Sequence, residues 1–132
     1  DKEGPEPEPG PVSCTGDGHR GSTYPCTPKP GFGGHVMVEG TDATARVNGV
    51  EFFRMGQTNV IARYPFHLHL VGEGGSRSYL SDSSIHRCFY RCVSIHGTSD
   101  ATLSGNVAFD IIGHCFYLED GVEENNQIEY NL

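Results

Sequence analysis

Long apolar runs and basic residues are both scarce in this sequence of 132 residues. No stretch of 18 apolar residues occurs, and the chain begins Asp1-Lys2-Glu3 without an apolar segment. We therefore expect neither a membrane span nor a targeting peptide, and hence a mature form or part of a longer chain. Nine basic against 17 acidic residues give a formal net charge of -8, which repels phosphate backbones and excludes nucleic acid as an expected partner.

Familiar catalytic motifs are also absent. The sequence has no Gly-x-Ser-x-Gly elbow, no phosphate-binding glycine-rich loop with Lys-Ser/Thr, no His-Glu-x-x-His and no dinucleotide fingerprint. A polyanionic sugar stays open as a partner, because a local basic patch or a bridging cation can bind one despite the net negative charge.

The five cysteines include no Cys-x-x-Cys pair that would indicate zinc or redox chemistry. Five are many for a cytosolic chain of this size, so we expect an oxidising compartment. Cys14 and Cys26 flank a Gly/Pro-rich loop that a disulfide would close. Cys88, Cys92 and Cys115 then form an odd set, which requires a free thiol or a partner elsewhere.

The first quarter of the chain lacks any regular pattern. Residues 1–11 alternate Pro, Glu and Gly, a composition that cannot bury enough apolar surface to become ordered. Residues 12–34 carry Gly, Pro, Ser and Thr at nearly every second position, without helical or strand periodicity. We expect residues 1–34 to be a leader and an irregular loop.

From residue 35 onward, short alternating runs separated by Gly and Asn predict strands, and no window keeps the spacing of an amphipathic helix. Ile85, Val107 and Ile128 each begin a similar unit, which gives a repeat of about 22 residues. The unit that begins at Val50 fits this repeat if it contains two loop insertions. The sequence thus predicts an all-β solenoid over residues 35–132, with one modest core.

In a parallel solenoid, residues one repeat apart become neighbours. Residues 65–69 align with residues 92–96 and 114–118. Strand alternation then divides the side chains between two faces. We expect the inner face to carry Phe66, Leu68, Val93, Ile95, Cys115 and Tyr117, and the outer face to carry His67, His69, Ser94, His96, His114, Phe116 and Leu118.

The outer histidines are candidate catalytic and metal-binding residues. His67 and His69, with His96 beside them, could hold a divalent cation such as zinc or calcium. His67, His69, His96 and His114, with Asp120, are candidates for acid/base catalysis, and Glu119 is a candidate substrate contact. A ladder of solvent-facing histidines beside a solvated acidic turn is the alternative interpretation.

Candidate sugar contacts lie close to these histidines in the sequence. Arg63, Arg87 and Arg91 could bind a sugar carboxylate through paired hydrogen bonds, or could simply keep the surface soluble. Phe116 on the outer face could stack on a pyranose ring, or could pack beneath a covering loop.

Several longer motifs resemble a known family, and the similar region extends from Gly33 to Leu132. It resembles the parallel β-helix repeats of the cell-migration-inducing hyaluronan-binding protein, cell-surface hyaluronidases and fibrocystin-like receptors. This chain differs in its Pro/Glu-rich leader and in having Arg87 where a second histidine is common. The motifs are Gly33-Gly34-His35-Val36-Met37, Arg46-Val47-Asn48-Gly49-Val50-Glu51-Phe52, Arg63-Tyr64-Pro65-Phe66-His67-Leu68-His69, Val93-Ser94-Ile95-His96-Gly97-Thr98 and Gly113-His114-Cys115-Phe116-Tyr117-Leu118-Glu119-Asp120-Gly121.

This resemblance implies a right-handed parallel β-helix, extracellular or at the cell surface, that is part of a larger β-helix. It also implies binding, or depolymerisation, of an acidic or amino-sugar polysaccharide such as hyaluronan. Hydrolysis and β-elimination both stay open as mechanisms. The alternative function is a non-catalytic structural or adhesive element of a cell-surface filament, coat or receptor, with self-association or a larger parent chain as the partner.

Overall fold

The computed structural model describes residues 12–15, 23–26 and 31–132. The chain divides into two compact units, Asp1–Pro30 and Gly31–Leu132. The division falls shortly before the expected start of the repeats, and Gly33 already donates a backbone hydrogen bond to the Gly56 carbonyl of the second unit.

The first unit contains a strand pair where the sequence predicted only loop. Strands β1 (Val12–Thr15) and β2 (Thr23–Cys26) pair antiparallel, with Cys14 opposite Tyr24 and Cys26 opposite Val12. This register corrects the expectation of an irregular segment at these positions. The expected tail over residues 1–11 and the side chains of both cysteines lie outside the described residues.

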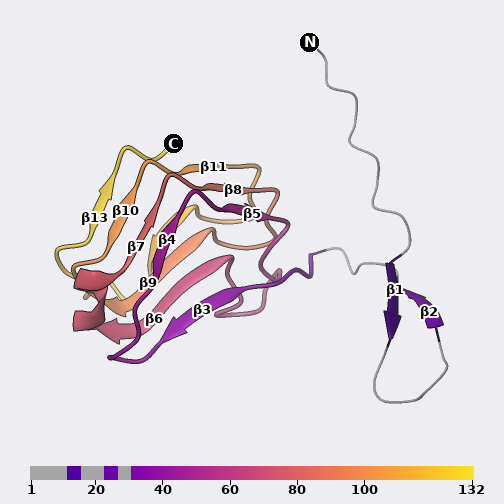
Figure 1. Ribbon diagram of the computed structural model, residues 1–132, viewed down its shortest axis with the longest axis horizontal. Helices are drawn as coiled ribbons and strands as arrows, with labels where there is room; N and C mark the ends of the chain where they lie inside the picture. Colours follow the sequence, from indigo (N-terminus) through magenta and orange to yellow (C-terminus); the bar gives the residue numbers. More distant parts are fainter. Residues whose placement is uncertain (1–11, 16–22, 27–30) are drawn as a thin grey trace, which may run out of the picture. The chain divides into compact units, whose positions relative to one another are not determined.

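The second unit is a parallel β-solenoid in which the chain visits three sheets in turn, as Figure 1 shows. Parallel pairing of strands from successive turns builds each sheet. The first sheet contains β3 (Val36–Glu39), β6 (Phe66–Gly72), β9 (Val93–Thr98) and β12 (Phe116–Leu118); the second contains β4 (Arg46–Asn48), β7 (Tyr79–Ser81), β10 (Thr102–Ser104) and β13 (Gln127–Glu129); and the third contains β5 (Glu51–Phe53), β8 (Ser84–His86) and β11 (Val107–Phe109).

Helical structure is almost missing from the described residues, as the sequence predicted. One 3-10 helix, η1 (Glu73–Arg77), connects β6 to β7. Across the described ranges, no helix combines the length and the apolarity that a membrane span requires.

The turns are longer than the predicted repeat, and they vary in length. Leu80 pairs with Leu103, an interval only slightly longer than predicted, whereas His69 pairs with His96 across 27 residues. The first full turn is longer still, because Asn48 pairs with Ser81 across 33 residues. Loops between strands absorb the extra residues, so the solenoid keeps its three sheets while the repeat length varies.

Apolar side chains that alternate along each strand fill the interior, because successive side chains of a strand point to opposite faces. Burial of this surface is the main stabilising contribution to such a fold. The fully buried core includes Phe66, Leu68, Leu80, Ile85, Val93, Ile95 and Leu103.

The sharp corners depend on residues in the left-handed backbone region. Arg54, Arg87 and Asp110 each follow a strand of the third sheet, with φ of 54°, 51° and 54°. This conformation is uncommon for residues other than glycine, and it recurs here in three successive turns. The corner therefore positions Arg87 at the end of the third sheet, before the chain returns to the first.

The predicted alignment of the repeat is wrong in several strands. Ile85 pairs with Phe52 and Ala108 rather than with Val50 and Val107, and Ile128 pairs with Leu103 of the second sheet rather than continuing the third.

Strand β12 is also shifted by one residue relative to the predicted alignment. Phe116 pairs with Val93, whereas the sequence alignment had matched Val93 with Cys115. Because a shift of one residue exchanges the two faces of a strand, Phe116 packs against the core and Tyr117 lies beside Ser94. The expected positions of Phe116 outside and Tyr117 inside are therefore wrong.

Candidate functional site

The outer face of the first sheet gathers polar side chains from successive turns. Strand alternation directs His67 and His69 of β6 away from the apolar interior. Parallel pairing then sets His69 beside His96 of β9, and His67 beside Ser94. The structure thus brings together the three histidines that the sequence nominated as metal ligands.

The three imidazoles form a compact cluster. The ring centroids of His67 and His69 are 4.9 Å apart, and those of His69 and His96 are 4.7 Å apart. Nitrogen atoms from the three rings all lie within 4.8 Å of one another. The Nδ1 atoms of His69 and His96 are 2.9 Å apart and share a hydrogen bond. Three imidazole nitrogens this close together are a candidate set of metal ligands.

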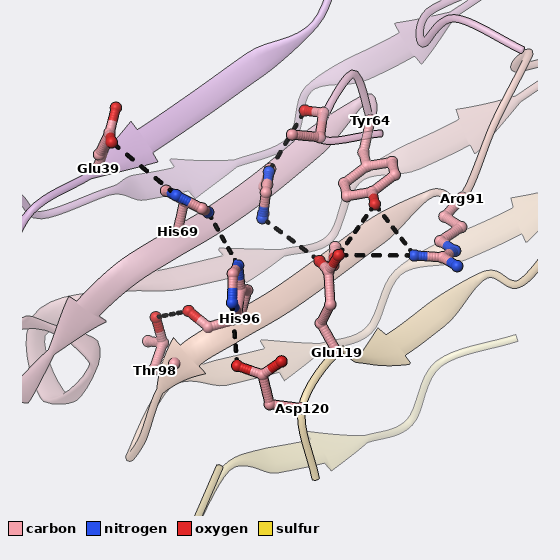
Figure 2. A network of polar contacts seen from close by, with 12 residues as sticks. Glu39, Tyr64, His69, Arg91, His96, Thr98, Glu119 and Asp120 are labelled. Carbon is pink, nitrogen blue, oxygen red and sulfur yellow. Dashed lines mark hydrogen bonds and ion pairs between the residues drawn. The ribbon is translucent and has the colours of Figure 1, made fainter. Parts of the chain in front are cut away.

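A carboxylate borders each of the two outer histidines. Asp120 Oδ2 lies 2.9 Å from His96 Nε2, and Glu39 Oε1 lies 3.9 Å from His69 Nε2. Figure 2 shows Glu39, His69, His96 and Asp120 following one another along one line of contacts. Both imidazoles are therefore oriented by an acidic neighbour on the side facing away from the cluster.

His67 differs from its neighbours because it is buried, with 1% of its surface exposed. Burial lowers the pKa of His67 to about 4, although the Ala62 carbonyl and Glu119 oppose this shift. The ring is therefore neutral near pH 7. Its Nδ1–H donates to the Ala62 carbonyl at 3.3 Å, which leaves Nε2 with a free lone pair. Nε2 has no hydrogen-bond partner and lies 3.7 Å from Glu119 Oε2.

Glu119 organises a second group of contacts beside the histidines. Its carboxylate accepts hydrogen bonds from the Tyr64 hydroxyl at 3.2 Å and the Ser94 hydroxyl at 2.8 Å. Arg91 Nη1 lies 3.8 Å from the same carboxylate and donates to the Tyr64 oxygen at 3.0 Å. Figure 2 shows the contacts that join Glu119, Tyr64 and Arg91 to one another. Burial raises the pKa of Tyr64, so its phenol is protonated at neutral pH.

Aromatic rings hold the Arg91 guanidinium in place. Its central carbon lies 3.9 Å from the ring centroid of Tyr117 and 5.4 Å from that of Tyr64. Tyr90 provides a third ring at 5.5 Å. A planar guanidinium stacks well on such rings, so Arg91 is a fixed donor in this network.

The remaining predicted residues lie outside the histidine cluster, and Arg87 lies at the end of the third sheet. His114 is exposed and stacks on Tyr117, with ring centroids 5.4 Å apart. Arg63 contacts His35 at 2.9 Å, and Arg87 lies at its corner with Asp110 at 3.9 Å. Phe116 packs against the core, which does not fit the candidate role of its ring in stacking on a sugar.

Sequence reasoning missed Tyr64 and gave Ser94 no role of its own. Tyr64 is fully buried, and its hydroxyl donates a hydrogen bond to Glu119, which lies 55 residues away in the sequence. Its only signal was its position in the Arg-Tyr-Pro stretch that precedes the histidine strand. The site therefore unites a buried neutral imidazole and a buried phenol around one carboxylate, groups of the kind that transfer protons in acid/base catalysis.

This fold and this arrangement define a parallel β-helix with a polar cluster on one outer face. Residues 31–132 match the family described as CEMIP beta-helix, and the chain belongs to that family. Over 106 residues it is 52% identical to a G8 domain-containing protein of Dictyostelium discoideum. The matched region covers 80% of this chain and 7% of that protein.

Two further relatives match a similar region. Protein rliB of Dictyostelium discoideum is 52% identical over 101 residues, covering 76% of this chain and 9% of that protein. The human protein named Cell surface hyaluronidase CEMIP2 is 40% identical over 107 residues, covering 76% of this chain and 8% of that protein. The chain thus spans less than a tenth of the length of each of these relatives.

Proposed function

We propose that this β-helix module binds an acidic polysaccharide of the hyaluronan class on the outer face of the first sheet, outside the cell or at its surface. The observation that carries the proposal is the convergence of His67, His69, His96 and Glu119 from three successive turns onto that face. Groups brought together across turns in this way form a single surface that an extended ligand can contact.

The spacing of the sheet suits a repeating ligand. Neighbouring strands lie about 4.8 Å apart, so a polysaccharide aligned with the solenoid axis meets a new strand at intervals comparable to one sugar ring. The partly exposed Arg91 is already oriented by its hydrogen bond to Tyr64 and its contact with Glu119, so it loses little conformational freedom when a ligand binds. Preorganised polar groups of this kind favour specific recognition of hydroxyl and amide groups.

The acidic residues on this face restrict how a uronate can bind. Glu39 and Asp120 lie beside His69 and His96, where their negative charges oppose a sugar carboxylate. Arg91 offsets part of the charge of Glu119. A protonated imidazole or a bridging cation would offset the remainder, so we expect the binding of an acidic sugar to depend on the histidines.

The family comparison supports the same class of ligand. A relative that is 40% identical over the matched region is named a cell surface hyaluronidase. The other relatives' names do not specify a ligand.

Equilibrium binding of fluorescent hyaluronan oligosaccharides to the 132-residue chain tests the proposal, with neutral dextran as the comparison ligand. We expect saturable binding of hyaluronan that weakens at least tenfold in the double variant His69→Ala/His96→Ala. His86→Ala is the matched control, because His86 lies on the third sheet and also bonds a carboxylate, Glu51, at 2.8 Å. Equal binding by the double variant and the control would refute the proposal.

Depolymerisation is the second candidate function, and the pair His67 and Glu119 favours it. A neutral imidazole with a free Nε2, 3.7 Å from a carboxylate that also accepts from Tyr64, has the parts required for proton transfer.

Product analysis separates binding from cleavage. Long hyaluronan incubated with the wild type should shorten if the module is an enzyme, and Glu119→Gln should abolish the shortening while the exposed control Glu129→Gln retains it. New ultraviolet absorbance from an unsaturated uronate would identify elimination. Unchanged chain length with retained binding would assign the module to adhesion or to a structural role.

A further inference from the structure

We infer that His67 Nε2, His69 Nδ1 and His96 Nδ1 form a three-nitrogen site for a divalent transition metal such as zinc. This inference goes beyond polysaccharide binding and does not depend on it, because the ligand atoms belong to the protein alone.

The distances between the donor nitrogens are close to those in a zinc site. Two histidine nitrogens on a tetrahedral zinc, each about 2.0–2.1 Å from the metal, lie about 3.3 Å apart. The Nδ1 atoms of His69 and His96 are 2.9 Å apart, and nitrogens of the three rings lie within 4.8 Å of one another. Small side-chain rotations would therefore complete the geometry.

The far nitrogen of each ring faces an oxygen atom. His67 Nδ1 faces the Ala62 carbonyl at 3.3 Å, His96 Nε2 faces Asp120 at 2.9 Å, and His69 Nε2 faces Glu39 at 3.9 Å. Histidines that bind metals almost always donate the other ring N–H to a carboxylate or a backbone carbonyl. In that state the three nitrogens of the cluster present lone pairs toward one another.

The buried atom His67 Nε2 provides independent support. It belongs to a side chain with 1% exposure and has no hydrogen-bond partner within the protein. A buried polar atom without a partner costs stability. A metal ion bound among the three histidines would accept this lone pair. A ladder of histidines that only faces solvent would not explain why the His67 nitrogen is buried.

The donor set selects the class of metal. Imidazole nitrogen suits zinc, copper, nickel and iron, whereas calcium takes six to eight oxygen ligands. Three histidines leave one tetrahedral position open for water or a substrate oxygen. Glu119 Oε2, 3.7 Å from His67 Nε2, lies next to the cluster, and the carboxylates of Glu39 and Asp120 add negative charge that attracts a cation.

Metal binding can be measured without any polysaccharide. Protein stripped with a chelator and dialysed against zinc should retain one zinc per chain by elemental analysis, and cobalt should give the visible absorption of a four-coordinate site. We expect His69→Ala and His96→Ala to lose the bound metal, and Asp120→Asn to bind it about 10- to 100-fold more weakly. Circular dichroism would verify that each variant remains folded.

His86→Ala is the matched control for this experiment. Its side chain is 17% exposed and contacts Glu51 at 2.8 Å, which resembles the 22% exposure of His96 and its 2.9 Å contact with Asp120. The control should bind zinc like the wild type. Stoichiometric zinc in the folded double variant His69→Ala/His96→Ala, no zinc in the wild type, or calcium binding alone would each overturn the inference. If the wild type binds no zinc but still binds hyaluronan, this inference fails and the proposed function stands.

Discussion

His69 and His96 meet through their Nδ1 atoms at 2.9 Å, although 27 residues separate them in the sequence. Two neutral imidazoles can share such a hydrogen bond only if one nitrogen carries the proton and the other accepts it. Because Asp120 lies 2.9 Å from His96 Nε2, we predict that His96 carries its proton on Nε2 and accepts at Nδ1 from His69.

Long-range proton–nitrogen correlation spectra of metal-free protein at pH 7.5 would reveal these tautomers. Asp120→Asn should weaken the preference of His96, because the carboxylate that holds the Nε2 proton is gone. A wild-type spectrum with the His96 proton on Nδ1 would contradict the arrangement.

The charge of Glu119 also contributes to stability. We predict that Glu119→Gln lowers the free energy of unfolding by about 1–2 kcal/mol, because Arg91 loses its anionic neighbour and Tyr64 and Ser94 lose a charged acceptor. Urea titration at pH 7 would measure the change. The exposed Glu129→Gln should stay within about 0.5 kcal/mol of the wild type, and equal effects of the two substitutions would argue against the network.

A buried asparagine connects three turns of the solenoid. Asn106 accepts from the Ser83 amide through its Oδ1 and donates through its Nδ2 to the Leu80 carbonyl and Asn131 Oδ1. Asn106→Ala leaves these buried groups without partners, so we predict a loss of about 2–4 kcal/mol.

The matched substitution is Asn48→Ala. Asn48 makes comparable hydrogen bonds to Ser81 and Asp82, but it is exposed, so water can replace them. We expect a loss of about 1 kcal/mol or less in the same unfolding measurement. A cost for Asn106→Ala as small as that for Asn48→Ala would show that the buried asparagine does not stabilise the stacked turns.

The interior cysteines should resist chemical modification. Burial raises the pKa of Cys88 and of Cys92, so little thiolate is present at pH 8. Because the thiolate is the reactive species, we predict that iodoacetamide labels both residues at least tenfold faster in urea than in the native protein. Peptide mass mapping would follow each site, and rapid labelling of native Cys92 would contradict the buried position.

Much of the fold was predictable from the sequence because short alternating runs and a recurring unit indicate a solenoid directly. The pairing of Phe66 with Val93, and hence of His69 with His96, followed from aligning the corresponding strands of successive units. Strand β12 was not aligned correctly, because the predicted repeat is one residue shorter than the interval from Val93 to Phe116. That small difference was enough to exchange the faces of Phe116 and Tyr117.

The site was only partly predictable, because corners and long-range contacts have weak sequence signals. Arg87 is close to the histidines in sequence, but its own φ of 51° places it in the corner that ends the third sheet. Tyr64 reaches Glu119 across 55 residues, which no local pattern reveals. Its burial depends on the packing of the loop that precedes β6, and that packing is a property of the folded chain.

The most direct test of the account is a titration of the isotopically labelled 132-residue chain with hyaluronan oligosaccharides, followed by nuclear magnetic resonance. We predict that the largest chemical-shift changes occur at His69, Ser94, His96 and Glu119 on the outer face of the first sheet. His86 and Phe109 of the third sheet should change little. Absence of saturable shifts, or shifts centred on the third sheet, would contradict the proposed binding face.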